Sequence, residues 1–406
     1  MMSETYDLAI IGGGSAGLMA ASFAVQLDAR VALLEKDRIG GDCTWTGCVP
    51  SKTLLKAAKV AHEMRTADRY GLPTVEPAVD LKTVMDHVRS VVGEIYQEET
   101  PEALRADGID VYLGEVRFLD PHTLIAGETT LKARNILIAT GAHAFSPPSP
   151  GLEEVDYWTY ESIWELEELP RRMLVVGGGP IGCEMAQAFR RLGSEVTLLA
   201  SGDRLLPRDE PDASRVLGEV FEAEGIQVVH NARAELVWKD QDGGIHAGAG
   251  GSGLASDALL VATGRRPNVN GLDLEKAGVT YSAEGIQVDD KLRTSQPHIY
   301  AAGDCIGSHQ FTHYAGWQAA MAVRNALLPG TSKGVTEQVP WTTFTEPEVA
   351  HAGLTEAQAR EKFGDDVLTC DWPMAKVDRA RSEGDTAGFL KLVHLKNGTL
   401  LGTTIV

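Results

Sequence analysis

Two stretches of the chain share one order of apolar runs and glycine-rich turns. Apolar runs at 8–11 and 173–176 each lead into a glycine turn, a helical pattern and a further apolar run, at 31–35 and 196–200. Each stretch predicts a βαβ unit in which glycine allows close backbone approach and the helix N-terminus faces a pyrophosphate. One G-x-G-x-x-G copy is weak evidence, but two in this context predict two dinucleotide-binding domains of an α/β protein. The motif glycines are Gly12, Gly14 and Gly17, then Gly177, Gly179 and Gly182.

The residue that ends each unit differs between the two copies. Glu35 and Ala200 lie at the same separation from the first glycine of their own copies. A carboxylate there accepts hydrogen bonds from a ribose 2′-hydroxyl, whereas alanine does not repel a 2′-phosphate, which Arg204 and Arg208 could bind. We therefore predict FAD at the first unit and NADPH, or else NADH, at the second. The alternative for both arginines is a solvated surface loop.

A shorter apolar repeat follows each unit. Residues 136–141 and 259–264 both end in Ala-Thr-Gly, which favours equivalent closing strands of two related domains over unrelated core strands. The segment 147–150, Pro-Pro-Ser-Pro, predicts a linker, and 265–268 predicts another break. The tail reads mostly as strands and ends in a hairpin around Asn397-Gly398.

Composition narrows the class of protein and partner. A chain of 406 residues exceeds what one core usually serves, and its net charge of −20 disfavours nucleic acid and anionic membranes as partners. No apolar run is long enough to span a bilayer, and no basic region precedes the apolar run at the N-terminus, so we expect no membrane span or signal peptide. Five cysteines argue against a secreted disulfide scaffold and favour a cytoplasmic location.

Two cysteines lie close together shortly after the first nucleotide-binding unit. Residues 40–52 read Gly-Gly-Asp-Cys43-Thr-Trp-Thr-Gly-Cys48-Val-Pro-Ser-Lys and open a helical pattern. A disulfide at this spacing needs a distorted first turn, which Gly47 and Pro50 make plausible, and a helix N-terminus favours a reactive thiolate. Metal binding lacks a second Cys or His cluster at ligand spacing, and inert core thiols or a structural disulfide are further alternatives. The location favours electron exchange with a flavin.

Over essentially its whole length the sequence resembles the class I pyridine nucleotide–disulfide oxidoreductases, which include dihydrolipoyl dehydrogenase, glutathione reductase and mercuric reductase. The resemblance rests on the paired glycine motifs, C-x4-C-V-P-S-K, both Ala-Thr-Gly turns and Ala-Ala-Gly-Asp-Cys at 301–305. Segments 205–211 and 377–381 look closest to the mercuric-reductase-like branch.

The resemblance implies three domains with two Rossmann-like folds of the glutathione-reductase type. The FAD-binding domain would comprise 1–148 and 266–332 and carry the redox disulfide, and the NAD(P)-binding domain would comprise 149–265. Residues 335–406 would form an incomplete α+β dimerisation domain of a homodimer. No metal site is implied.

The resemblance also implies roles for single residues. Cys48 would lie against the flavin, Cys43 would face the substrate, and Lys52 would lie near flavin N5 and pair with Glu184. Asp304 would bind the ribityl or pyrophosphate region, Val116 would offer backbone to the adenine, and Thr312 would begin a helix facing the pyrimidine. Further cofactor contacts are expected at Lys36, Gly41, Thr140, Gly141 and, for NAD(P), Gly264.

The chain departs from the family pattern in several places. Asp42 replaces a usual Thr, which should alter an FAD phosphate contact and raise the pKa of the Cys43 thiol, unless Asp42 is simply an N-cap. Trp45 replaces a smaller or aliphatic residue and either shapes access to the cysteines or packs. The chain stops before the family's late His–Glu or Cys–Cys pair, so we expect a truncated chain. The remaining cysteines are predicted as small core residues: Cys183, Cys305 and Cys370.

These observations predict an NAD(P)H-dependent flavoenzyme. Electrons would pass through FAD and the Cys43–Cys48 disulfide to a small acceptor, which could be a disulfide or a metal ion. The alternative is a non-catalytic flavin-binding remnant that lacks the C-terminal acid–base or metal-handling residues.

Overall fold

The computed structural model describes residues 5–241, 243–249 and 252–406. The chain divides into two compact units. The first comprises residues up to Pro50, Arg89–His143 and Arg265–Glu337, and the second comprises Ser51–Val88, Ala144–Gly264 and Gln338–Val406. The three-domain division expected from the sequence is finer than this one and stays a prediction.

The first unit is built on a sheet in the order β3-β2-β1-β6-β5-β4, with β18 also paired to β6. Strands β1, β2, β3, β6 and β18 are parallel, and β1 is almost wholly buried, as a central parallel strand covered on both faces must be. The strands are β1 (Tyr6–Ile11), β2 (Val31–Glu35), β3 (Ile109–Leu113), β4 (Val116–Asp120), β5 (Thr123–Ala126), β6 (Thr129–Ile138) and β18 (Ile299–Ala301).

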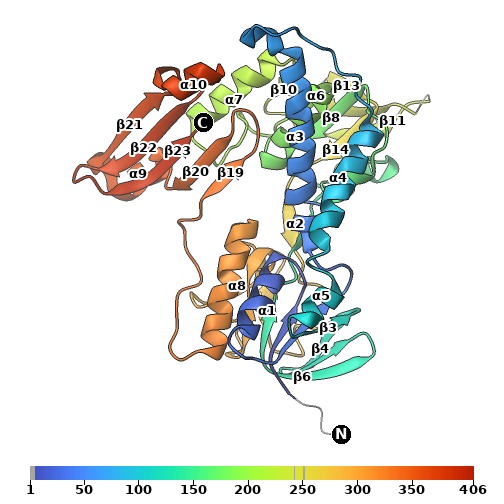
Figure 1. The fold of residues 1–406 in the computed structure, drawn as a ribbon, viewed down its shortest axis with the longest axis vertical. Coiled ribbons are helices and arrows are strands. Elements are labelled where there is room, and N and C mark those ends of the chain that lie inside the picture. The colour runs from blue at the N-terminus through green and yellow to red at the C-terminus, as the bar shows by residue number, and fades with distance from the viewer. Residues whose placement is uncertain (1–4, 242, 250–251) are drawn as a thin grey trace. The chain divides into compact units, whose positions relative to one another are not determined.

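Helices α1 and α8 lie side by side in this unit (Figure 1). The buried face of α1 is made of small residues, among them Ala16, Ala20 and Ala24, which allow the two helices to approach closely. The helices that lie wholly or partly in the unit are α1 (Ser15–Val25), α2 (Gly41–Trp45), α3 (Cys48–Arg65), α4 (Leu81–Tyr96), α5 (Pro101–Ala106) and α8 (Thr312–Leu327). Short strands are β7 (Ala142–Ala144), β15 (Arg265–Pro267), β16 (Tyr281–Ser282) and β17 (Gly285–Ile286).

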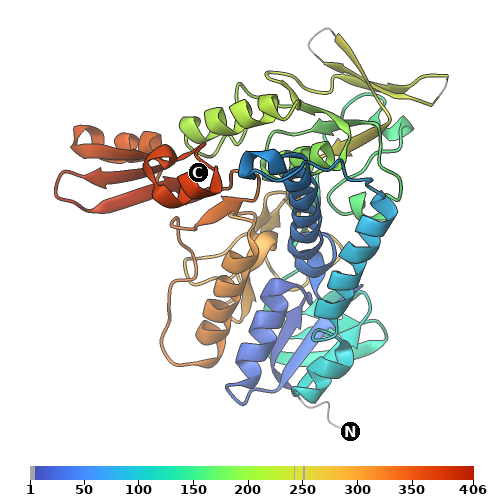
Figure 2. The same cartoon turned by 45° about the horizontal axis from the view of Figure 1, so that its top comes forward.

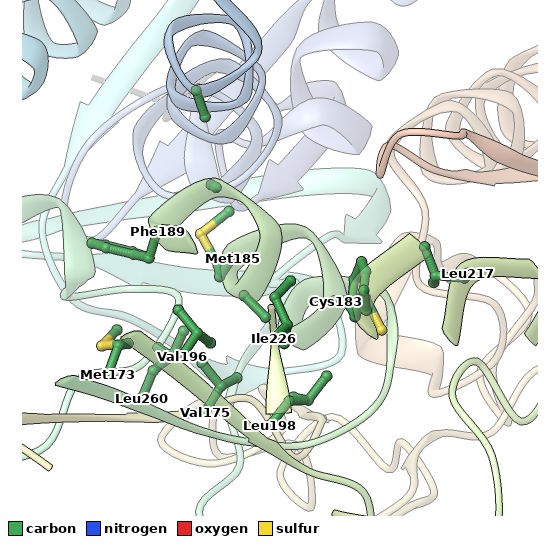
Figure 3. Close-up of a cluster of buried hydrophobic side chains, with 14 of the residues drawn as sticks. Met173, Val175, Cys183, Met185, Phe189, Val196, Leu198, Leu217, Ile226 and Leu260 are labelled. Carbon is green, nitrogen blue, oxygen red and sulfur yellow. The ribbon is translucent and has the colours of Figure 1, made fainter. Parts of the chain in front are cut away.

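The second unit contains the other predicted βαβ unit, in a parallel sheet of order β10-β9-β8-β14. Met185 and Phe189 of α6 lie above Val175 and Leu198 of the sheet, in the buried cluster of Figure 3. The elements are β8 (Arg172–Val176), α6 (Pro180–Leu192), β9 (Glu195–Leu199), α7 (Pro211–Ala223), β10 (Gln227–Val229) and β14 (Ala258–Val261), with the antiparallel strands β11 (Leu236–Lys239), β12 (Ile245–Ala249) and β13 (Ser252–Ser256) beside them.

The end of the chain forms an antiparallel sheet in the order β19-β20-β23-β22-β21, within the second unit. Figures 1 and 2 show α9 packed on this sheet, where Ala359 meets Val367 and Val393. The predicted hairpin is present as β22 and β23. The elements are β19 (Trp341–Thr343), β20 (Val349–Gly353), α9 (Glu356–Phe363), β21 (Val367–Pro373), α10 (Asp378–Glu383), β22 (Phe389–Leu395) and β23 (Leu400–Ile405).

The structure confirms the fold class and the two closing strands. In each unit the first strand of the βαβ motif pairs in parallel with its closing strand, β6 or β14. Thr140 and Thr263, the threonines of the two Ala-Thr-Gly turns, both donate to a backbone carbonyl, that of Asn268 and of Phe145 respectively. The two turns therefore have the same local chemistry.

The cysteines outside the close pair differ in burial. Cys183 and Cys305 are buried, as predicted, and burial raises the pKa of the Cys305 thiol to about 12. The prediction for Cys370 was wrong, because its side chain is exposed on β21. This strand lies at the edge of the sheet, where sequence alternation does not reveal whether a face is covered. Among the described residues, no helix combines the length and apolar character that a membrane span requires.

Candidate active site

The two close cysteines lie on either side of a break between two helices. Cys43 belongs to α2 and Cys48 is the first residue of α3. A Cβ on Gly47 would lie 2.8 Å from the Asp42 carbonyl oxygen, so glycine permits the tight turn between them. The predicted distortion is therefore present, and the two side chains meet across it through a hydrogen bond.

Three elements of the first unit converge on these thiols. Cys48 Sγ lies 3.2 Å from Thr312 Oγ1, at the first residue of α8. The Cys43 side chain hydrogen-bonds to Cys48, to Thr312 and to Ser15. Ser15 begins α1, directly after Gly14 of the glycine turn. The first dinucleotide turn and the start of α8 are thus both joined to the cysteine pair.

The pKa of the Cys43 thiol is raised above its ordinary value. Its hydrogen bond to Cys48 is the main cause and burial adds to it, whereas the hydrogen bonds to Thr312 and Ser15 act in the opposite direction. The pKa of Cys43 is thus raised, as predicted, but the cause is not the predicted Asp42 carboxylate, and the lowering expected at a helix N-terminus is not found. The physical reason is that the hydrogen bond to Cys48, burial and the nearby Cys48 charge all disfavour the Cys43 thiolate.

The first glycine turn has the backbone shape that a dinucleotide pyrophosphate requires. A Cβ on Gly17 would lie 1.8 Å from the Gly12 carbonyl oxygen, and one on Gly41 would lie 2.7 Å from Gly14 Cα. Glu35 ends β2, and its Oε2 accepts a hydrogen bond of 2.7 Å from Gly13 N. The carboxylate is thereby fixed at the turn, where a ribose is expected, and these residues fit FAD.

The other residues predicted to contact FAD lie on separate elements of the first unit. Lys36 is exposed directly after β2, and Val116 is buried at the start of β4. Gly141 has a φ of 69°, at the turn after β6. Asp304 lies in the short helix Gly303–Ile306 that precedes α8. Their roles in cofactor binding stay predictions.

Sequence reasoning missed Arg265. Its guanidinium pairs with Asp42, and its Nη1 lies 2.7 Å from Asp304 Oδ2. Burial raises the pKa of Asp304, and the charge of Arg265 opposes that shift. The N-cap alternative for Asp42 was wrong, because Gly40 is the N-cap of α2 and the carboxylate is paired instead. The only signal in the sequence was that Arg265 directly follows the second Ala-Thr-Gly turn.

The structure shows that Trp45 packs. Its indole Nε1 donates to the Ile39 carbonyl oxygen at 2.7 Å, and its ring lies against Tyr96 and beneath Arg38. The neighbouring Thr44 donates to the half-buried Glu99, which sequence reasoning also missed. These contacts anchor α2, the helix that carries Cys43.

In the second unit, the predicted Lys52–Glu184 pair is formed. Lys52 Nζ lies 3.0 Å from Glu184 Oε2, and Glu184 is only 8% exposed. Glu184 Oε1 accepts from Phe344 N at 2.9 Å, and the Lys52 ammonium lies 4.3 Å from the centre of the Phe344 ring. The Lys52 ammonium is thus positioned by a buried carboxylate and an aromatic face.

A second side chain of α6 also hydrogen-bonds to the backbone of the segment 344–346. Gln187 Nε2 donates to the Glu346 carbonyl oxygen at 2.8 Å, and Glu346 N donates to Gln187 Oε1 at 2.7 Å. The Glu346 carboxylate pairs with Lys59 of α3 and with the buried Arg191 of α6. Side chains of α6 therefore satisfy the backbone of this segment as a neighbouring strand would.

The second glycine turn repeats the close approach of the first. A Cβ on Gly182 would lie 1.8 Å from the Gly177 carbonyl oxygen, whereas Gly179 and Gly264 have open space around them. Ala200 is buried, and a Cβ added at Gly178 would lie 2.9 Å from the Ala200 Cβ. Arg204 donates to the Pro207 carbonyl oxygen at 2.8 Å, and Arg208 is exposed. Both arginines follow β9 on the loop where a 2′-phosphate is expected.

Comparison with known proteins places this geometry in a family. Residues 6–322 match the model of the pyridine nucleotide-disulphide oxidoreductases, and residues 339–406 match that family's dimerisation domain. The chain belongs to this family. Pyridine nucleotide-disulphide oxidoreductases bind FAD and use NAD(P)H, which agrees with the two dinucleotide turns.

Several relatives within the family are similar over most of this chain. A mercuric reductase of Bacillus cereus is 39% identical over 99% of this chain and 64% of its own length, and one of Streptomyces lividans is 38% identical over 99% and 86%. A dihydrolipoyl dehydrogenase of Bacillus subtilis is 36% identical over 88% and 79%. The chain thus spans less than two thirds of the length of the Bacillus cereus protein and more than two thirds of the length of the other two.

Solved structures agree with the fold. The HOCl-induced flavoprotein disulfide reductase RclA from Escherichia coli has a TM-score of 0.87 and 31% identity, covering 98% of this chain and 89% of that one. LpdA from Mycobacterium tuberculosis has a TM-score of 0.88 and 29% identity, covering 98% and 89%.

Proposed function

We propose that this protein is an FAD-dependent disulfide oxidoreductase that passes electrons between NAD(P)H and a small acceptor through Cys43 and Cys48. One observation carries the proposal. The Cys43 thiol hydrogen-bonds both to Cys48 and to Ser15, the residue that follows Gly14 in the first dinucleotide turn. A redox pair is therefore built directly onto the predicted FAD site. The non-catalytic alternative is not favoured, since the similar proteins are named as reductases and dehydrogenases.

The cysteines would carry the exchange with the acceptor. Bound FAD would supply two-electron transfer between a nicotinamide and sulfur. With a disulfide acceptor, the Cys43 thiolate attacks one acceptor sulfur and expels the other as a thiolate, which takes up a proton. The Cys48 thiolate then attacks Cys43 Sγ, which re-forms the Cys43–Cys48 disulfide and releases the second acceptor thiol. The acceptor gains two electrons and two protons.

The surrounding residues would hold the reacting groups. Thr312 hydrogen-bonds to both sulfurs, and the N-terminus of α8 favours negative charge near Cys48. Glu184 pairs with the Lys52 ammonium and orients it, and we propose that Lys52 is the cation beside the flavin.

NADPH is the pyridine nucleotide that the second turn favours. Ala200 stands where Glu35 stands in the first copy, so no carboxylate opposes a 2′-phosphate, and Arg204 and Arg208 follow on the same loop. The test is kcat/KM with NADPH and with NADH. Alanine at both arginines should lower the NADPH value and leave the NADH value unchanged. A wild-type preference for NADH would contradict this assignment.

A metal ion or a small disulfide is the acceptor class that the relatives support. Mercuric reductases are among the similar proteins, and the similarity to their branch was also present at 205–211 and 377–381. The match of 339–406 to the dimerisation domain supports a homodimer. A cytoplasmic location is part of the proposal and is supported by the odd number of cysteines, which does not suit a secreted disulfide scaffold.

Counting thiols tests the redox role. Anaerobic NADPH should expose two additional thiols per chain to an alkylating reagent and produce absorbance beyond the main flavin band. Cys43→Ser and Cys48→Ser should abolish the additional thiols and the turnover of Hg(II), lipoamide or glutathione disulfide. Cys370→Ser is the matched control, since that cysteine is exposed and distant in sequence. Equal thiol numbers before and after reduction would show that the pair is not the redox centre.

A further inference from the structure

A group of three charges in the first unit takes no part in the electron-transfer steps above, although one member, Asp304, is a predicted FAD contact. Arg265 lies between two carboxylates, forming an ion pair with Asp42 and a 2.7 Å contact with Asp304. The Arg265 and Asp304 side chains are only 16% and 12% exposed, whereas Asp42 is 37% exposed. One guanidinium therefore serves two carboxylates at a largely desolvated position, where an unpaired charge is expensive.

Asp42 lies beside the first dinucleotide turn. Asp42 follows Gly41, whose backbone packs so tightly on Gly14 that a Cβ at 41 would be 2.7 Å from Gly14 Cα. Gly14 belongs to the turn expected to receive the pyrophosphate. A carboxylate beside that turn would repel the phosphates, and Thr, the usual residue of the family at this position, would not. The chain thus carries a negative charge where FAD binding disfavours one.

We propose that Arg265 is a positioning residue for FAD that acts by neutralising Asp42. The inference rests on the proposed FAD site. Arg265 ties the carboxylate of Asp42 to that of Asp304, so that Asp42 does not face the pyrophosphate as an unpaired charge. The two residues work as a coupled pair: the need for arginine at 265 depends on the aspartate at 42. A planar fork with several donors suits this bridge better than a single ammonium.

A double-mutant cycle on FAD affinity tests the coupling. The variants are Arg265→Met, Asp42→Asn and the double variant, in the full chain stripped of flavin. The probe is FAD, whose dissociation constant is read from the change in its fluorescence at low and high ionic strength. Arg266→Met is the matched control, because it removes the same charge one residue away from an exposed position.

The coupling predicts a defined order of affinities. Arg265→Met should weaken FAD binding by about 30-fold or more. Asp42→Asn alone should change it by about threefold at most, and adding it to Arg265→Met should recover about tenfold. Salt should reduce the defect of Arg265→Met, because the repulsion is electrostatic. Arg266→Met should bind as the wild type does.

Two results would overturn the inference. They are wild-type affinity in Arg265→Met, and a double variant that binds no better than Arg265→Met. Failure of the wild-type chain to bind FAD would instead overturn the proposed function. If Arg265→Met does not fold, Arg265→Lys replaces it: one ammonium should bridge the carboxylates poorly, with a smaller loss that Asp42→Asn again relieves. Absence of that relief would equally refute the coupling.

Discussion

Replacing Gly182 by alanine should disable the second nucleotide site and leave the first intact. The added Cβ would lie 1.8 Å from the Gly177 carbonyl oxygen, whereas ordinary contact begins at 3.4 Å. The start of α6 and the glycine turn must therefore separate by about 1.6 Å. Misplacement of reacting groups by about 1 Å can cost about 100-fold in rate, which corresponds to about 2.7 kcal/mol. We expect a loss of at least this size in kcat/KM for NADPH.

The assay must separate this local effect from loss of the whole fold. Flavin content per chain should stay unchanged, because the turn at Gly17 is untouched, while calorimetry should show weakened NADP⁺ binding. Gly218→Ala, in α7, is the control: its Cβ meets no atom within 4 Å, and its helical backbone suits alanine. Normal nucleotide affinity in Gly182→Ala, or an equal loss in both variants, would refute the steric reasoning.

Further predictions concern the buried charges and the exposed cysteine. Glu184→Gln should cost about 1 kcal/mol in unfolding free energy, since Lys52 is 39% exposed, and should slow flavin reduction by NADPH in stopped-flow measurements. Burial acts to raise the pKa of Glu346, but its lysine and arginine partners hold it below the ordinary 4.5. The stabilisation from the ionised Glu346 is complete above pH 4.5 and is lost as the pH falls through the lowered pKa of Glu346. The free energy of unfolding should therefore fall less steeply with acid in Glu346→Gln than in the wild type. An unchanged dependence on pH would contradict this prediction. In the double variant Cys43→Ser/Cys48→Ser, Cys370 should react with a thiol reagent in the folded protein, whereas the buried Cys183 and Cys305 should react only after unfolding. More than one reactive thiol in the folded protein would contradict this prediction.

The sequence predicted those parts of the molecule that depend on local patterns. The two βαβ units and the helix break between Cys43 and Cys48 follow from glycine spacing and apolar runs. The helix that begins at Thr312 was implied by the family resemblance. Pairing of Lys52 with Glu184 came from family resemblance rather than from physics. Neither local patterns nor the family resemblance predicted the ion pairs of Arg265, because Asp42 and Asp304 lie far from it along the chain.

Errors occurred where tertiary surroundings outweigh local sequence. Cys370 was predicted buried because cysteine usually is, but an edge strand left its face uncovered. The pKa of Cys43 was expected to be raised by Asp42, but the main cause of its raised pKa is the adjacent Cys48 thiol. In both cases a neighbour that the pattern cannot identify decides the outcome.

The hydrogen bonds between α6 and residues 344–346 limit how proteins of this family could be recombined. A crossover in the gap between the two family matches, 322 and 339, looks natural from sequence alone. A chimaera joined there would keep Glu184 and Gln187 from one parent and receive Phe344 and Glu346 from the other. Either parent would supply these backbone groups, but the Glu346 carboxylate would lose its pairing with the buried Arg191 of α6 if the other parent lacked that arginine. Successful grafts should therefore transfer α6 together with the C-terminal sheet.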